Sequence, residues 1–286
     1  MIGAHAVTDL HIHVQPWEML LPEVRVRMER GRKDMEAIRE CMASPRALLR
    51  FLDRAGIDRV ALINYPSPDL MGFTAAVNDW CADYCAEAPE RLIPFGSVHP
   101  RFTSDPAGET NRILDRGIRG LKVHPPHQLV QANEYRTGGP GAGIGEVYRV
   151  AEERGVPVMI HTGTSVFPGA RNVYADPMPA DDVAVDFPRM PLILAHAGRP
   201  LHGETALFLA RRHPQIWLDL SGIPPKKLLE YVPRLPEIAD RCLWGSDWPG
   251  PGVPDMRRNV EQFLELGLPE DARRAILDGN SRRLFP

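Results

Sequence analysis

The 286-residue sequence has only four cysteines, no long apolar run and little net charge. No two cysteines have CxxC spacing, so the sequence contains no motif of that kind for zinc or redox chemistry. No stretch approaches the roughly 18 apolar residues that a membrane-spanning helix requires. A formal net charge of −3 supplies neither a basic field for nucleic acid nor an acidic tail. The composition therefore argues against a membrane protein and against a nucleic-acid-binding protein.

The first residues also lack the features of a secretory signal peptide. No basic segment precedes an apolar run, and Asp9, His11 and His13 come too early for such a peptide. Together with the low cysteine content, this start predicts a cytoplasmic protein in a reducing compartment. The sequence also has no GxSxG nucleophile elbow, which argues against a serine hydrolase.

What the sequence does contain is a repeated alternation of short aliphatic runs with amphipathic stretches. Strands that alternate with helices predict a parallel sheet, and eight such units predict a closed (β/α)8 TIM barrel. With 43% hydrophobic residues the chain can bury a large core, and we expect one domain over residues 1–286. The predicted strands are Ala6–His13, Arg59–Asn64, Leu92–His99, Ile118–His124, Val156–Thr162, Leu192–Ala197, Ile216–Ser221 and Arg241–Asp247.

The helical stretches between these runs often end at a glycine, as at Gly56 and Gly155, which is a common stop signal. Long loops follow the first strand (residues 15–43) and the fourth strand (residues 125–143). In a barrel both would lie on the catalytic face, so we expect them to cover the substrate. The predicted helices are Pro45–Ala55, Thr74–Glu87, Glu109–Arg116, Ile144–Arg154, Asp181–Phe187, Glu204–Arg212, Pro225–Ala239 and Arg257–Leu266, with a final helix at Asp271–Leu277.

The strongest chemical signal is the sequence DLHIH at residues 9–13. In a regular strand, residues two apart point to the same face, so His11 and His13 would face one side and Leu10 and Ile12 the other. Two imidazoles placed in this way can bind one metal ion, since histidine is a common zinc ligand. The alternative is a pair of surface histidines on a polar strand face.

Three further polar residues stand at the ends of predicted strands: His161 on the fifth, His196 on the sixth and Asp247 on the eighth. Each alone is more typical of a structural residue. In a barrel, however, the carboxyl ends of all strands converge on one cavity, so these side chains would meet the histidines of the first strand. Their coincidence predicts an open metal site.

The HxH pair at residues 11–13, the strand-ending His161 and His196, and Asp247 within GSDWP resemble the amidohydrolase superfamily. The similarity is closer to the amidohydrolase-related branch, which includes aminocarboxymuconate-semialdehyde decarboxylase and TIM-barrel metal-dependent hydrolases. It extends over nearly the whole chain. The motif combination is specific for the superfamily but says little about the substrate.

The resemblance implies that His11, His13, His161 and Asp247 surround one divalent metal ion, most often zinc. Asp247 would also accept a proton from metal-activated water, and His196 would act as an acid/base or carbonyl-polarising histidine. A homodimer is a further expectation from the resemblance.

Lys122 and His124 share a face of the fourth strand, and Arg199 follows His196 closely. In superfamily members with two metals, a carboxylated lysine at the end of the fourth strand bridges the ions. We favour one ion, with Lys122 and His124 contacting the substrate or the ligands, and keep the bridging role of Lys122 as the alternative. Arg199 is a candidate for binding a substrate carboxylate, as are Arg136 and Arg171, and the alternative for each is an exposed arginine.

Two reactions fit this metal site. The leading hypothesis is hydrolysis of a C–N or C–O bond in a small molecule, such as an amide or lactone, by metal-activated water. The second is non-oxidative decarboxylation of a small aromatic or unsaturated carboxylic acid. A third hypothesis is a metal-independent lactonase, or a barrel that only binds a small molecule. Metal content and the placement of Arg199 would discriminate among them.

Overall fold

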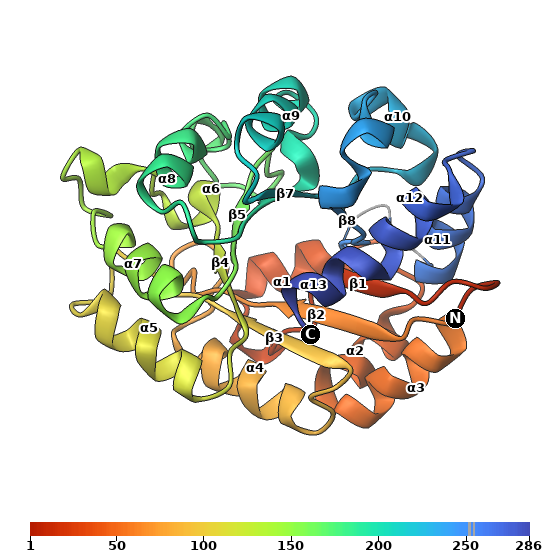
Figure 1. Ribbon diagram of the computed structural model, residues 1–286. Coiled ribbons are helices and arrows are strands. Elements are labelled where there is room, and N and C mark those ends of the chain that lie inside the picture. The colour runs from red at the N-terminus through yellow and green to blue at the C-terminus, as the bar shows by residue number, and fades with distance from the viewer. Residues whose placement is uncertain (251–252, 254) are drawn as a thin grey trace.

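The computed structural model describes residues 1–250, 253 and 255–286, and its strands form one parallel sheet (Figure 1). Hydrogen-bonded neighbours follow the order β1 to β8 along the chain. Every neighbouring pair is parallel, as expected for strands joined by helical crossovers. The strands are β1 (Thr8–Ile12), β2 (Arg59–Ile63), β3 (Leu92–Gly96), β4 (Gly120–Val123), β5 (Val158–His161), β6 (Leu192–Ala195), β7 (Ile216–Asp219) and β8 (Cys242–Leu243).

Hydrogen bonds between the last strand region and the first close the sheet. The Leu10 amide donates to the Trp244 carbonyl over 2.9 Å, and the Asp247 amide donates to the His11 carbonyl over 2.8 Å. Strand β8 has only two residues, fewer than predicted. The residues after it form separate hydrogen bonds with β1 and no regular β-ladder. The predicted (β/α)8 barrel is thereby confirmed.

The interior of the barrel is filled by apolar side chains that the strands direct inward. The phenyl ring of Phe285, near the C-terminus, belongs to this cluster, and its carbonyl accepts a 2.7 Å hydrogen bond from the Arg59 guanidinium. The C-terminal segment therefore closes the end of the barrel that is remote from the strand C-termini. The other members are Leu10, Ala61, Ile63, Ile93, Phe95, Met159, Ile193, Ala195, Trp217 and Leu243.

Helices surround the sheet on its outer side (Figure 1). The longest have 11 residues. In the described part of the chain, none combines the length and apolar character needed to cross a bilayer. The helices are α1 (Pro22–Glu29), α2 (Met35–Ala43), α3 (Pro45–Ala55), α4 (Ala76–Ala86), α5 (Pro106–Asp115), α6 (Pro125–Gln128), α7 (Ile144–Arg154), α8 (Ala180–Asp186), α9 (Gly203–Arg212), α10 (Leu228–Tyr231), α11 (Met256–Leu264), α12 (Glu270–Arg274) and α13 (Asn280–Leu284).

The prediction of one helix over residues 225–239 is wrong. The segment contains only the single turn α10 between two 3₁₀ stretches, Pro225–Lys227 and Leu235–Arg241. Pro233 and Pro236 explain the interruption, because proline lacks the amide donor that an α-helix interior needs and clashes with the preceding turn.

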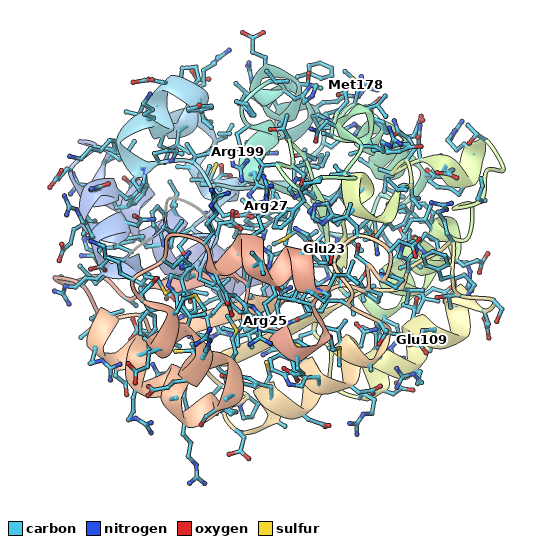
Figure 2. All side chains as sticks on the ribbon, turned by 180° about the vertical axis from the view of Figure 1, so that it is seen from behind. Glu23, Arg25, Arg27, Glu109, Met178 and Arg199 are labelled. Carbon is cyan, nitrogen blue, oxygen red and sulfur yellow. The ribbon has the colours of Figure 1, made fainter. Side chains whose placement is uncertain are left out.

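Both long loops lie at the mouth of the barrel, as predicted. The loop after β1 forms α1 and α2, and the loop after β4 begins with α6. Figure 2 shows α1, with Glu23, Arg25 and Arg27, crossing the end of the barrel opposite to α13. The Arg27 guanidinium donates to the Val166 carbonyl over 3.1 Å, which ties α1 to the loop after β5. The first inserted segment therefore covers part of the catalytic face.

Candidate active site

A cavity of about 270 Å³ opens among the loops that follow the strands. The first long loop contributes Met28 to its wall, and the fourth strand and its loop contribute Lys122, His124 and His127. The cavity thus gathers residues that are far apart in the sequence. The other lining residues that the argument uses are His13, Tyr65, His161, Ser165, Phe167, His196, Arg199, Gly222 and Asp247.

Strand β1 reaches this cavity through a β-bulge. Asp9 pairs with Val60, and Ile12 pairs with Leu62, so β1 has one more residue than β2 between the two pairs. The expectation that Leu10 and Ile12 share a face is therefore wrong: Leu10 packs inside the barrel, whereas Ile12 joins the outer core. Bulges re-aim side chains, and this one lets Leu10 fill the interior while His11 still reaches the site.

The Asp9 carboxylate secures the bulge. Its Oδ1 accepts hydrogen bonds from the His11 amide at 3.2 Å and from the Ser246 amide at 2.9 Å. Burial raises the pKa of Asp9 to about 7, although the bonds from Ser246 and His11 favour its charged form. Asp9 therefore joins β1 to the loop after β8, which carries Asp247.

The structure brings His11, His13 and Asp247 together, with potential ligand atoms within 4.8 Å of one another. Asp247 Oδ1 lies 3.1 Å from Nε2 of His13 and 3.8 Å from Nε2 of His11. Asp247 adopts a φ of 69°, in the left-handed region that non-glycine residues rarely occupy. Such backbone strain is concentrated at functional sites, where the surrounding structure enforces it.

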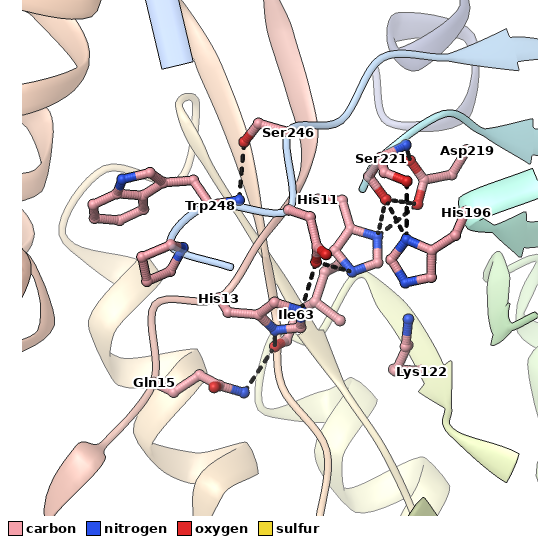
Figure 3. A network of polar contacts seen from close by, with 12 residues as sticks. His11, His13, Gln15, Ile63, Lys122, His196, Asp219, Ser221, Ser246 and Trp248 are labelled. Carbon is pink, nitrogen blue, oxygen red and sulfur yellow. Dashed lines mark hydrogen bonds and ion pairs between the residues drawn. The ribbon is translucent and has the colours of Figure 1, made fainter. Parts of the chain in front are cut away.

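Each of these two imidazoles is fixed from behind by an oxygen atom. His11 Nδ1 lies 2.5 Å from Asp219 Oδ2, and His13 Nδ1 lies 3.2 Å from the Ile63 carbonyl (Figure 3). Both oxygens accept, so Nδ1 carries the proton and Nε2 offers a lone pair. His11 Nε2 is buried and has no hydrogen-bond partner among the described residues. This arrangement is typical of metal-binding histidines, so the donor set fits a divalent ion.

Asp219 and Ser221 are site residues that the sequence analysis did not identify. Ser221 Oγ lies 2.8 Å from Asp219 Oδ2 and 3.1 Å from His11 Nδ1, so both residues orient the same imidazole. A signal was present, because both residues end the seventh predicted strand and are two positions apart. They belong to the same cavity-facing edge as the predicted ligands.

We expect Asp219→Ala to weaken zinc binding by about 10- to 100-fold, since loss of a residue that orients a metal-binding histidine has that typical effect. Asp219→Asn, which keeps an acceptor oxygen for His11 Nδ1, should lose less. Competition with a chromophoric chelator measures both affinities, and circular dichroism checks that each variant is folded. Equal zinc affinity in wild type and folded Asp219→Ala would contradict this role.

His196 forms part of the wall beside His11, with 4.8 Å between ring centroids. Its Nδ1 lies 3.0 Å from the Ser221 carbonyl, which can only accept, so Nδ1 carries the proton and Nε2 is an acceptor. His196 also has a left-handed backbone, with a φ of 65°. His11, His196 and Asp219 form a second group whose potential ligand atoms lie within 4.8 Å. The Asp219 contacts to His11 and Ser221 favour an orienting role for this carboxylate.

His161 lines the cavity but is not in either group of potential ligands among the described residues. Its Nε2 lies 3.1 Å from the Gly163 carbonyl, and its ring centroid lies 4.6 Å from that of His196. The assignment of His161 as a metal ligand stays a prediction.

Lys122, His124 and Arg199 also line the cavity, and their role as substrate contacts stays a prediction. Lys122 is 1% exposed, and its amine points toward the His196 ring in Figure 3. The ring of His124 stacks on that of His161, with 3.9 Å between centroids. The Arg199 guanidinium lies 3.5 Å from Asp247 Oδ2. The two histidines lie next to the other carboxylate oxygen, Oδ1.

Burial controls the charges in the cavity. It lowers the pKa of His11 to about 4, with the Lys122 charge adding to the effect, and lowers the pKa of His161 and His196 well below the usual range. Burial alone would raise the pKa of Asp247, but the polar groups around its carboxylate, among them His13 and the Arg199 guanidinium, lower that pKa strongly. Neutral imidazoles beside an ionised carboxylate are the protonation states that metal binding requires.

Comparisons with known proteins identify the family of this chain. The amidohydrolase family model matches residues 8–286. A 4-sulfomuconolactone hydrolase from Rhizobium radiobacter is 26% identical over 268 residues, which cover 83% of this chain and 78% of the relative.

Two solved structures share the fold. An uncharacterized TIM-barrel protein from Bordetella bronchiseptica has a TM-score of 0.77 at 22% identity and covers 98% of both chains. A 5-carboxyvanillate decarboxylase from Novosphingobium aromaticivorans, with bound manganese, has a TM-score of 0.70 at 14% identity and covers 99% of this chain and 97% of its own. Together with the family match, which spans nearly the whole sequence, these findings show that the chain is an enzyme of the amidohydrolase family.

Proposed function

We propose that this enzyme hydrolyses a small lactone with water activated at a metal site in the barrel mouth. The observation that carries the proposal is the convergence of His11, His13 and Asp247, with both imidazoles held from behind by protein oxygens. The relative named 4-sulfomuconolactone hydrolase supports a lactone over an amide as the substrate.

The residues that would hold the ion are His11, His13 and Asp247, with His161 as the proposed fourth ligand. Two neutral imidazoles and a carboxylate suit zinc, which is the metal that we propose. A bound divalent ion supplies a Lewis acid that polarises the substrate carbonyl and makes water more acidic. We propose one ion per chain, with Lys122 as a neighbour of the substrate.

Asp247 and His196 would accept the protons that the reaction releases. Asp247 Oδ1 lies 3.1 Å from His13 Nε2, and Oδ2 lies 3.5 Å from the Arg199 guanidinium. The carboxylate therefore lies beside the proposed ligand atoms, where it could accept a proton from the attacking water. The His196 ring, with its proton on Nδ1, presents Nε2 to accept a second proton. This tautomer favours an acid/base role for His196 over polarisation of a carbonyl, which would need a proton on Nε2.

Two cations of the cavity favour an acidic substrate. The Nε atom of Arg199 is buried with no hydrogen-bond partner among the described residues. Gly222 makes room for the guanidinium, because a Cβ there would lie 2.4 Å from Arg199 Nη2. The Lys122 amine contacts Met159 Sδ at 3.6 Å. We propose that a carboxylate or another acidic group of the lactone binds Arg199, with Lys122 nearby.

Decarboxylation is the second candidate, because the Arg199 guanidinium beside Asp247 could equally hold the carboxylate that departs as CO₂. The manganese-bound decarboxylase of the same fold makes this reaction worth testing in parallel. The two reactions differ in their products: a lactone gives a hydroxy acid with no loss of carbon, whereas an aromatic acid releases CO₂.

The decisive experiment combines metal analysis with a substrate screen. Enzyme purified without chelator should contain about one divalent ion per chain and should hydrolyse acidic five-membered lactones. Removal of the ion by chelation should abolish turnover, and added zinc should restore it. Mass spectrometry for lactone opening, together with CO₂ detection on aromatic acids, separates the two reactions.

Other outcomes would overturn specific parts of the proposed function. Two ions per chain with a carboxylated Lys122 would show that the lysine bridges metals. Metal-free enzyme that keeps full activity after chelation would place the protein with metal-independent lactonases. Release of CO₂ without any lactone hydrolysis would favour the decarboxylase.

A further inference from the structure

A chain of three hydrogen-bonding side chains runs along the cavity wall, from the loop after β2 to the loop after β5. The Tyr65 hydroxyl lies 3.0 Å from His127 Nδ1, and His127 Nε2 lies 2.7 Å from Ser165 Oγ. Tyr65 and His127 are 3% and 5% exposed, whereas Ser165 is half-buried in the loop after β5. The chain therefore connects a buried phenol to the neighbourhood of solvent.

The loop that carries the outer end of this chain is firmly held. The Ser165 amide donates to Asn172 Oδ1 over 2.8 Å, and Asn172 Nδ2 donates back to the Ser165 carbonyl over 3.1 Å. The Phe167 amide donates to Ser165 Oγ over 3.3 Å. Ser165 thus presents its hydroxyl to His127 from a fixed position.

Tyr65 and His196 line the same cavity. Ring contacts run from Tyr65 to His124 at 4.8 Å and from His124 to His161 at 3.9 Å. They continue from His161 to His196 at 4.6 Å. On the other side, His13 binds the carbonyl of Ile63, two residues before Tyr65, and its ring lies 5.1 Å from that of His11. Three successive ring contacts therefore separate Tyr65 from His196 along the cavity wall.

We propose that Tyr65 is the general acid that protonates the leaving oxygen of the lactone, and that His127 and Ser165 restore its proton. The inference rests on the proposed lactone hydrolysis. As the acyl C–O bond breaks, the Tyr65 O–H proton moves to the departing oxygen, while the His127 Nδ1–H proton moves to the phenol oxygen. The Ser165 hydroxyl proton moves to His127 Nε2, and solvent water replaces it at Ser165.

The proton balance closes over the whole reaction. Water adds oxygen to the acyl carbon, gives one proton to Asp247 and gives the second, from the new carboxyl group, to His196. The leaving oxygen gains one proton from Tyr65, which solvent replaces at Ser165, and Asp247 and His196 return their protons to solvent. Neutral His127 carries one ring proton before and after, so it transfers a proton without storing charge. That proton moves from Nδ1 to Nε2, and exchange with solvent water returns the ring to the Nδ1–H form before the next turnover. Burial supports this, since it lowers the pKa of His127 to about 3 and raises that of Tyr65 far above its usual value.

The test compares two lactones that differ in their leaving group. An aliphatic γ-lactone that bears a carboxylate expels an alkoxide, which needs a proton, whereas a dihydrocoumarin that bears a carboxylate expels a phenoxide, which is far less basic. Tyr65→Phe should lower kcat for the aliphatic lactone by roughly a hundredfold or more, the usual scale for a general acid. With dihydrocoumarin the loss should stay below about tenfold, because a weaker base gains less from protonation. Tyr231→Phe, on α10 outside the cavity, is the matched control.

Ser165→Ala supplies a second, less invasive variant. The backbone bonds of residue 165 with Asn172 do not depend on the hydroxyl, so the loop should keep its shape. The variant should show a smaller loss than Tyr65→Phe, again confined to the aliphatic lactone. If the wild type hydrolyses both lactones and Tyr65→Phe slows both equally, Tyr65 is not the general acid, although the proposed function stands. If the wild type opens neither lactone, the inference falls together with the proposed function.

Discussion

Replacing Asp247 by asparagine is expected to reduce kcat by about a thousandfold or more, within the range known for removal of an essential proton acceptor. The carboxylate oxygen that lies 3.1 Å from His13 Nε2 and 3.8 Å from His11 Nε2 would become part of a neutral amide. The substitution keeps the size of the side chain and one oxygen that can bind metal. We therefore expect a folded enzyme with weaker metal binding and almost no turnover, even with excess zinc.

The measurement is the rate at saturating zinc, with metal content determined on the same sample. Asp83→Asn is the matched control, since the Asp83 side chain is 71% exposed and pairs with Arg116 on the surface. Recovery of nearly the full rate by Asp247→Asn once zinc is restored would show that Asp247 is a ligand only. The proton acceptor would then have to be sought at His196 or His124.

The barrel could be predicted because each of its eight strands carries a local signal. Aliphatic runs, helical stretches and glycine stops are properties of short segments, and their number alone indicates closure. The length of the last strand could not be predicted. Residues 244–248 form backbone hydrogen bonds with β1, which lies at the other end of the sequence. The single helix expected at residues 225–239 does not form, because Pro233 and Pro236 interrupt it.

The candidate site could be predicted in part. His11, His13 and Asp247 come together because they end strands that meet at one face of the barrel. The bulge in β1 was not predictable from alternation, since it depends on pairing with β2 and on the Asp9 carboxylate. The role of Asp219 could not be predicted from the sequence either, because a carboxylate that orients a histidine is recognised only by its contact with that ring.

Two histidine substitutions should separate metal binding from proton transfer. His11→Ala should lose both the metal ion and turnover, because it removes a buried Nε2 that has no other partner in the described structure. His196→Ala should keep most of the metal yet lose roughly a hundredfold or more in kcat, as expected for a residue that transfers protons. His202→Ala, just before α9, controls for loss of a histidine outside the cavity.

The contrast between the two variants matters more than either result alone, because His11 and His196 lie side by side and share Ser221 as a partner. Ser221 Oγ is 3.1 Å from His11 Nδ1 and 2.9 Å from His196 Nδ1, so either substitution could disturb the other ring. Ser221→Ala measures that shared effect, and metal content is determined for all three variants. If His196→Ala strips the metal whereas Ser221→Ala keeps it, His196 is itself a ligand. The ion would then lie between His11 and His196, and Asp247 alone would remain to accept the proton of the attacking water.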